Sequence, residues 1–210
     1  MGLMYVAEKA RSILRGLLQT YGIKSMKRSL WNVEFSRGRW DCLESTPGDV
    51  VYGCIEKYAN KGSILDLGCG SGSTGNELDA TAYGDYTGVD ISDVAVERAR
   101  RRAGENGRAD KNKYLQADIS DYVPTQQFNV ILFRDSIYYV PRAKIKRMLD
   151  RYSQYLREGG VFIVRMSSVS GERKTILDTI ESGFEVVEKG LSVQPNTVVI
   201  VFRRRKMLGL

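Results

Sequence analysis

Short apolar runs alternate with helix-like segments along the chain from residue 63 onward. Seven runs suit buried strands, at residues 64–67, 86–90, 113–117, 128–133, 161–166, 184–189 and 197–202. Stretches with helical patterns lie between them, at about 73–80, 93–104, 141–156 and 172–182. Strands that alternate with helices of this length build β-α-β units. The pattern therefore predicts an α/β fold with a mostly parallel sheet covered by helices on both faces.

The connection between the last two predicted strands breaks this alternation. It consists of residues 191–196 only, and parallel neighbours need a crossover of about a dozen residues or more. We therefore expect one reversed strand near the edge of a seven-stranded sheet.

The first 48 residues follow a different pattern. Residues 5–21 place apolar side chains at helical spacing, which predicts an amphipathic helix. We expect its apolar face to dock on the core; a lid over a ligand and a helix lying on a membrane surface are the alternatives. Residues 31–47 are aromatic and polar and indicate a connecting segment, after which Asp49 should cap a helix that runs to about Ala59.

Composition narrows the class of protein. With 210 residues, 42% of them hydrophobic, the chain can bury one core without a disulfide or metal staple. It contains no histidine, which excludes a histidine general base. The three cysteines form no CxxC pair, and no apolar run approaches the roughly 18 residues that span a bilayer. We expect a cytoplasmic protein, and no cluster of metal ligands is visible.

The net charge of +7 is concentrated at the two ends of the chain. Residues 1–40 hold eight basic and two acidic side chains, and residues 203–206 are all basic, whereas the remainder is mildly acidic. Nucleic-acid-binding proteins usually carry a basic stripe through the fold. Nucleic acid is therefore the less favoured partner, and weak attraction to acidic surfaces such as lipid headgroups stays open.

A glycine-rich turn, DLGCGSG, follows the first predicted strand. Gly68, Gly70 and Gly72 alternate there, which allows a sharp bend and lets a ligand approach the backbone. The dinucleotide-binding fingerprint would require glycine at position 73, where this chain has Ser73. The motif is weak by itself, and a tight turn that binds nothing is its alternative.

Acidic side chains mark three successive strands. Asp90, followed by Ile91, ends the second strand and is placed to accept hydrogen bonds from both hydroxyls of a ribose. Asp118 ends the third and can accept from the exocyclic amine of an adenine, unless it only caps a turn. Asp66 lies inside the first, apolar strand, where a carboxylate is costly to bury unless a group such as a cationic ligand amine pairs with it.

These three segments, DLGCGSG (66–72), GVDIS (88–92) and QADIS (116–120), together resemble the class I S-adenosylmethionine-dependent methyltransferases over roughly residues 50–203. The resemblance implies a Rossmann-like sheet of order 3-2-1-4-5-7-6 and S-adenosyl-L-methionine as cofactor. It further implies the contacts of that cofactor: the methionine part with Asp66 and the loop Gly68, Cys69, Gly70 and Gly72, the ribose with Asp90 and Ile91, the adenine with Asp118 and Ile119, and the sulfonium end with the backbone carbonyl of Arg134.

The acceptor side rests on a narrower resemblance. The segment FNVILFRDSIYYV (128–140) resembles one found in a subgroup that includes nodulation-type N-methyltransferases and glycan-modifying relatives. Asp135 takes the place of a glutamate there, and Arg134 departs from an asparagine. Asp135 is the candidate general base, or the group that orients an acceptor hydroxyl or amine, with a structural carboxylate as the alternative. The candidates to line the acceptor pocket are Trp40, Tyr138 and Tyr139.

We therefore predict a methyltransferase that acts on nitrogen or oxygen of a small molecule, with a carbohydrate or an amino sugar as the first candidate. The alternatives are an RNA or protein methyltransferase and a non-catalytic scaffold that binds the cofactor. The expected organisation is an N-terminal helical lid segment (1–48), a methyltransferase domain (49–203) and a basic tail (204–210).

Overall fold

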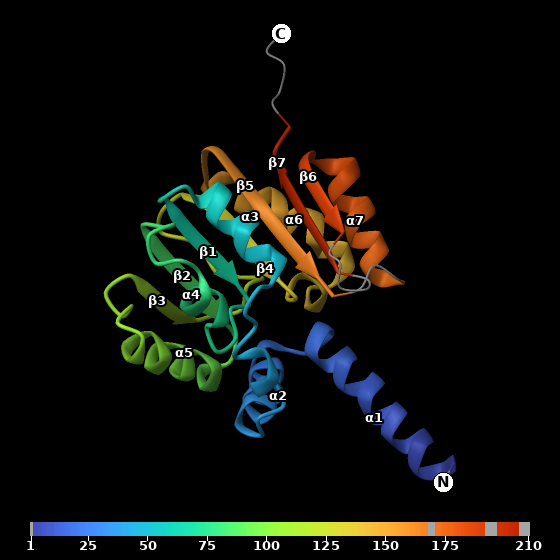
Figure 1. Cartoon of the computed structure of the whole chain (residues 1–210). Coiled ribbons are helices and arrows are strands. Elements are labelled where there is room, and N and C mark those ends of the chain that lie inside the picture. The colour runs from blue at the N-terminus through green and yellow to red at the C-terminus, as the bar shows by residue number, and fades with distance from the viewer. Residues whose placement is uncertain (1, 168–170, 192–196, 206–210) are drawn as a thin grey trace.

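A computed structural model of the chain describes residues 2–167, 171–191 and 197–205. Its strands form one seven-stranded sheet of order β3-β2-β1-β4-β5-β7-β6 (Figure 1). The strands are β1 (Ser63–Leu67), β2 (Asp85–Asp90), β3 (Asn112–Gln116), β4 (Phe128–Arg134), β5 (Leu156–Met166), β6 (Glu185–Leu191) and β7 (Val198–Arg203). The pairs from β3 through β5 are parallel, and β7 runs antiparallel to both β5 and β6. The predicted sheet, its order and its reversed strand are confirmed; most of the short connection before β7, residues 192–196, lies outside the described residues.

Helices cover both faces of this sheet. The helices are α1 (Gly2–Tyr21), α2 (Lys24–Ser36), α3 (Val50–Ala59), α4 (Ser73–Glu77), α5 (Asp93–Glu105), α6 (Arg142–Tyr152) and α7 (Glu172–Gly183), with 3-10 turns η1 (Asp41–Leu43), η2 (Ile137–Tyr139) and η3 (Ser153–Tyr155). Helices α6 and α7 pack on one face, and α3 and α5 pack on the other. Within β1, Leu65 and Leu67 join the first core and Ile64 joins the second, as the alternation of side chains along a strand requires.

Several element boundaries differ from the sequence-based prediction. The connecting segment predicted over 31–47 is wrong at its start, because α2 continues to Ser36. Its tryptophan and phenylalanine have modest helix propensity, so tertiary packing decides their conformation. The helix predicted over 141–156 ends at Tyr152, and β5 begins at Leu156 rather than 161. The start of this strand was not predicted because it contains Gly159 and Gly160, and glycine is depleted in strands.

Helix α1 does not pack its apolar side on the core, so that expectation is wrong. The helix projects from the body, with its C-terminal end near α2 and its N-terminal end far from the sheet (Figure 1). Ile13, Leu14 and Leu17 are exposed, whereas Gln19 is buried. Helix α1 therefore contacts the rest of the chain through a side that contains the buried Gln19 and the half-buried Leu18, while most of its apolar side chains stay exposed.

The predicted cap of α3 is present. Asp49 Oδ1 accepts a hydrogen bond from the backbone N–H of Val51 at 3.1 Å, which satisfies one free donor of the first turn. Ser92 does the same for α5, since its Oγ accepts from Ala95 N–H at 3.1 Å. These caps fix the starts of two helices that follow directly on segments bordering the carboxyl edge of the sheet.

The turn after β1 depends on a close approach between two neighbouring strands. Gly68 has φ +89°, and a Cβ at this position would lie 2.4 Å from Cβ of Ser136, which follows β4. The Ser136 hydroxyl donates a hydrogen bond to the Leu67 carbonyl, which ties the two strand ends together. Glycine is needed here for both its conformation and its size. The tie lies between β1 and β4, where the strand order reverses.

We expect Gly68→Ala to lower the free energy of unfolding by about 3 kcal/mol, because about 1 kcal/mol for the left-handed conformation adds to the cost of overpacking against Ser136. Gly107→Ala is the matched control, since Gly107 has φ +64° and a Cβ added there would have no neighbouring atom within 4 Å. It should lose only about 1 kcal/mol. Urea denaturation measures both, and equal losses would show that the contact with Ser136 carries no cost.

Candidate functional site

A cavity of about 440 Å³ lies at the carboxyl ends of β1, β2, β3 and β4. Open α/β sheets bind ligands at this edge, where the strand order reverses, and the volume is typical of small-molecule sites. The cavity brings together nearly all of the residues predicted from the sequence: Trp40, Asp66, Gly68, Cys69, Gly70, Asp90, Ile91, Asp118, Ile119, Arg134, Asp135, Tyr138 and Tyr139. Gly72 does not line it. A Cβ on Gly72 would meet Ala99 and Tyr114, so this glycine allows close packing behind the loop.

Asp66 is the most deeply buried charge-bearing group of the cavity, at 1% exposure. The Tyr86 hydroxyl donates a hydrogen bond to Oδ2 at 2.5 Å, whereas Oδ1 has no hydrogen-bond partner among the residues that the structure describes. A buried carboxylate oxygen without a donor is costly. Burial raises the pKa of this carboxyl to about 6. The unmet oxygen fits the cationic amino group of an amino acid, which is what the predicted cofactor would bring.

Asp90 joins the glycine-rich loop to the second strand. Its Oδ2 accepts from Gly70 N–H at 2.9 Å, and its Oδ1 accepts from Ser92 N–H at 2.8 Å. Each carboxylate oxygen can accept a further hydrogen bond, so both remain able to take a ribose hydroxyl. Burial raises the pKa of Asp90 to about 6. The two backbone bonds hold the carboxylate in one orientation at the cavity wall.

Asp118 has a partner that the sequence did not reveal. The ammonium of Lys27, on α2, lies 2.5 Å from Oδ2 of Asp118, and both side chains are nearly buried. Ser120 N–H donates to Oδ1 at 2.9 Å, so Asp118 also caps a turn. Burial by itself raises the pKa of this carboxyl, but the hydrogen bonds from Lys27 and Ser120 outweigh it and lower the pKa. The carboxylate is thus ionised, and it ties α2 to the third strand.

Two arginines cross the wall of the cavity at the ends of β4 and β5. Arg134 Nη2 donates to Asp49 Oδ2 at 2.8 Å and to Thr46 Oγ1 at 2.7 Å. Arg165 pairs with Asp135, and its Nε lies 3.5 Å from Asp49 Oδ2. The Arg134 side chain is therefore held by the segment before α3. Its predicted contact with the cofactor is through the backbone carbonyl, which takes no part in these side-chain contacts.

The Asp135 carboxylate is held from several sides. Arg165 pairs with Oδ2, Ser167 N–H donates to Oδ1 at 2.9 Å, and the Tyr138 hydroxyl lies 3.4 Å from Oδ1. The residue itself has φ +52°, which is uncommon for a side chain larger than glycine and occurs often at functional sites. A carboxylate held in this way presents its oxygens to the cavity in one fixed orientation.

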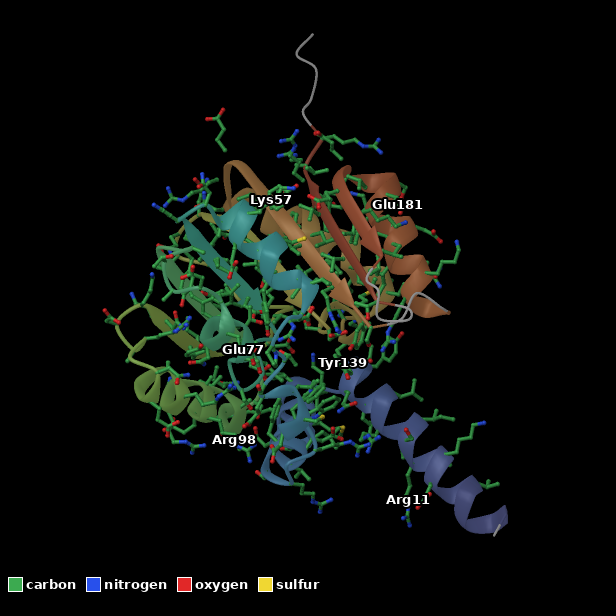
Figure 2. All side chains as sticks on the ribbon, in the orientation of Figure 1. Arg11, Lys57, Glu77, Arg98, Tyr139 and Glu181 are labelled. Carbon is green, nitrogen blue, oxygen red and sulfur yellow. The ribbon has the colours of Figure 1, made fainter. Side chains whose placement is uncertain are left out.

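An aromatic wall closes the cavity on the side of α2 and η2. The ring of Trp31 meets that of Tyr139 edge-on, with centroids 4.8 Å apart, and lies 5.8 Å from Trp40. Tyr138 and Tyr139 are neighbours at 4.8 Å. Figure 2 shows Tyr139 where the C-terminal end of α1 meets the body. Burial raises the pKa of Tyr139 to about 12, so its phenol stays neutral at neutral pH.

Among the polar residues of the cavity that were missed from the sequence are Gln19, Lys27 and Arg165. Gln19 and Lys27 lie on N-terminal helices, outside any motif, and only tertiary packing brings them to the strand ends. Arg165 had a readable signal, since it interrupts the apolar run VFIVRM much as Asp66 interrupts the first strand. Gln19 is 5% exposed, and within residues 2–167, 171–191 and 197–205 its Nε2 has no hydrogen-bond partner, so it offers an amide donor to the cavity.

Cys69 has a packing position rather than a reactive one. Burial raises the pKa of its thiol well above the ordinary value, which keeps the sulfur protonated. Its Sγ lies 2.9 Å from where a Cβ on Gly88 would be, so the thiol fills the space between loop and second strand.

The chain is similar to known proteins over this region. Residues 64–160 match the family model described as "Methyltransferase domain". The mRNA cap guanine-N(7) methyltransferase of Schizosaccharomyces pombe is 28% identical over 123 residues, which cover 52% of this chain and 34% of that protein. The chain thus spans about a third or less of the length of the curated mRNA cap relatives that it matches.

Solved structures show the same fold. Magnesium protoporphyrin IX methyltransferase (ChlM) from Synechocystis PCC 6803, with bound SAH, aligns with a TM-score of 0.67 at 17% identity, over 87% of this chain and 100% of that one. The N-methyltransferase NodS from Bradyrhizobium japonicum WM9, in complex with S-adenosyl-L-homocysteine, aligns with a TM-score of 0.61 at 18% identity, over 74% and 86% of the two chains. These structures confirm the predicted fold, and the match of residues 64–160 to the methyltransferase domain supports the predicted class I resemblance and its cofactor; the nodulation-type subgroup stays a prediction.

The raised pKa of Asp66 gives a testable pH dependence. Its value near 6 in the folded protein exceeds the usual 3.8, so the folded state holds this proton more tightly than the unfolded chain does. The protonated carboxyl therefore favours folding fully below about pH 4, and this contribution is lost as the pH rises through about 6. We expect Asp66→Asn, which keeps an acceptor for Tyr86, to raise the free energy of unfolding at about pH 7.5 by about 2 kcal/mol, with a smaller gain at about pH 4.5.

The same variant should bind S-adenosyl-L-homocysteine about tenfold or more weakly by calorimetry, because the amino group loses its charged acceptor. Asp110→Asn, at an exposed position, is the control and should change neither quantity. A variant that is neither more stable nor weaker in binding would contradict the assignment of Oδ1.

Proposed function

We propose that this chain, a class I S-adenosylmethionine-dependent methyltransferase in sequence and fold, transfers the methyl group to a nitrogen or oxygen atom of a small molecule. The first candidates for the acceptor are a carbohydrate and an amino sugar, from the resemblance of residues 128–140 to the nodulation-type subgroup. The observation that carries the proposal is the cavity itself. Its floor offers a carboxylate oxygen with no hydrogen-bond partner in the described part of the chain, and aromatic rings line its other side.

The cradle for the cofactor would be built by the strand ends. In this proposal Asp66 Oδ1 accepts from the amino group, and the backbone of Gly68 and Gly70 follows the methionine part. Asp90 accepts from the ribose, and Asp118 with Ile119 receives the adenine. When bound, the cofactor supplies a methyl group on a positively charged sulfur, which is already electrophilic. The chain then has mainly to align the acceptor atom with that methyl and to exclude water.

The acceptor would lie between the aromatic wall and the end of β4. Rings such as Trp40 and Tyr139 present flat apolar faces of the kind that stack on sugars, and Gln19 Nε2 is a free donor for an acceptor hydroxyl or carbonyl. Asp135, held by Arg165, is proposed to orient the acceptor amine or hydroxyl and to receive its proton. No metal ion enters this proposal.

The N-terminal 48 residues are proposed as the lid of this site. Trp31, Phe35 and Trp40 line the cavity from above the strand ends, and Lys27 joins α2 to Asp118. Residues 49–203 would form the catalytic domain and residues 204–210 a basic tail, of which 206–210 lie outside the described residues. A cytoplasmic location is proposed from the three cysteines, all of which are free thiols.

A labelled-methyl transfer screen tests the function. The purified protein is incubated with methyl-labelled S-adenosylmethionine and amino sugars, hydroxylated small molecules, capped RNA or a protein extract. We expect transfer to a small molecule. Transfer to RNA alone, falling steeply with salt as counterion release requires, would assign the alternative function. Tight cofactor binding without transfer to any acceptor would indicate a scaffold.

The role of Asp135 is tested on the acceptor found in that screen. We expect Asp135→Asn to lower kcat by about 100-fold, since positioned acid–base groups contribute about that much or more, with the affinity for S-adenosyl-L-homocysteine unchanged. Asp150→Asn is the control, because Asp150 is an exposed α6 acid paired with Lys146. An unchanged kcat would remove Asp135 from the chemistry.

A further inference from the structure

The apolar side of α1 faces away from the protein. Five of its large apolar side chains are more than half exposed: Val6 (64%), Ile13 (58%), Leu14 (57%), Leu17 (51%) and Tyr21 (64%). Their spacing of three, four and seven residues places them on one stripe of the helix. A contiguous apolar stripe of this kind in water usually marks a surface that binds something.

The opposite side of α1 holds the helix to the body. Gln19 is buried against the cavity, and Arg15 Nε lies 3.2 Å from Oε1 of the nearly buried Glu34. A surface helix of a globular protein normally has the reverse arrangement, with apolar side chains inward and polar ones outward. Because α1 is attached through its other side, these apolar side chains do not pack against the core of this chain.

The apolar surface continues past the end of the helix. Ile23, in the turn between α1 and α2, is 70% exposed, and Met26 on α2 is 42% exposed. These two side chains and the five above are together called here the α1 stripe. Figure 1 shows α1 extending away from the sheet with no other labelled element along its outer half.

Basic side chains border the α1 stripe. Lys9 and Arg11 are exposed, and on a helical wheel they fall on opposite edges of the apolar sector. Figure 2 places Arg11 on the part of α1 that has left the body. The surrounding segment, residues 1–40, holds eight basic and two acidic side chains. An apolar stripe between cationic edges complements a surface that is apolar inside and acidic at its border.

We propose that the α1 stripe docks on an anionic lipid bilayer, with α1 lying in the interface rather than crossing it. The apolar side chains would enter the boundary between headgroups and acyl chains, while Lys9 and Arg11 would meet acidic headgroups. A second copy of the chain fits less well, because two α1 stripes packed face to face would bring their cationic edges together. Among the helices that the structure describes, none has the length and apolarity needed to cross a bilayer. The proposal is independent of methyl transfer.

Sedimentation with vesicles tests it, using phosphatidylcholine vesicles with and without phosphatidylserine. The full chain should partition at least about tenfold more strongly onto the vesicles that contain phosphatidylserine. Ile13→Gln/Leu17→Gln, which leaves every charge in place, should reduce this partition by about tenfold. Lys9→Gln/Arg11→Gln should reduce it roughly tenfold as well, without changing the weak binding to phosphatidylcholine.

The matched control is Val123→Gln/Val187→Gln, two exposed valines away from α1, which should leave partition unchanged. Unaltered affinity for S-adenosyl-L-homocysteine verifies that the α1 variants fold. Partition that survives Ile13→Gln/Leu17→Gln would overturn the proposal and assign binding to charge alone. A wild-type dimer in analytical ultracentrifugation that this variant converts to a monomer would also overturn it, by assigning the stripe to a second copy.

Discussion

Burial of the Asp66 carboxylate inside β1 is the constraint around which the site is built. The carboxylate accepts a hydrogen bond from Tyr86 on the neighbouring strand, and its Oδ1 has no partner in the part of the chain that the structure describes. The fold tolerates this cost because the oxygen borders a cavity in which a cation can lie. Two neighbouring features leave room for that cavity. The chain turns at Gly68, which has a positive φ, and the Asp90 carboxylate accepts a hydrogen bond from Gly70 N–H, which fixes the loop. Strand β1 thus contributes buried apolar side chains to the core and the buried Asp66 carboxylate to the site.

The cavity has two parts of different origin. The floor consists of strand ends and the loop after β1, which lie within the matched methyltransferase domain. The aromatic wall comes from α2 and η2. Contacts between residues close in sequence fix the floor, such as the hydrogen bond from Ser92 N–H to the Asp90 carboxylate. Contacts between segments far apart in the sequence fix the aromatic wall, such as the ring contact between Trp31 and Tyr139.

This difference explains how far the sequence could predict the molecule. The sheet order was implied by the resemblance to class I methyltransferases. The carboxylates of the floor were predictable because parallel strands end at one edge: Asp66 interrupts a recognisable apolar run, and Asp90 and Asp118 each come at the end of one. Lys27 was not, since nothing in its local sequence relates it to a strand end about ninety residues later. The orientation of α1 was not either: periodicity shows that a helix has an apolar side, but not what that side faces. For Asp135, position was predicted and its pairing with Arg165 was not.

The ion pair between Lys27 and Asp118 links the N-terminal segment to the matched region, so it limits how far the chain can be shortened. The family match begins at residue 64, which invites trimming the chain to that boundary for expression. A chain trimmed to that boundary would lose Lys27, whose ammonium pairs with the Asp118 carboxylate, together with α3, whose Val51 and Ile55 are fully buried in the core. The N-terminal helices therefore complete the charge balance of the cavity, although they lie outside the matched residues 64–160.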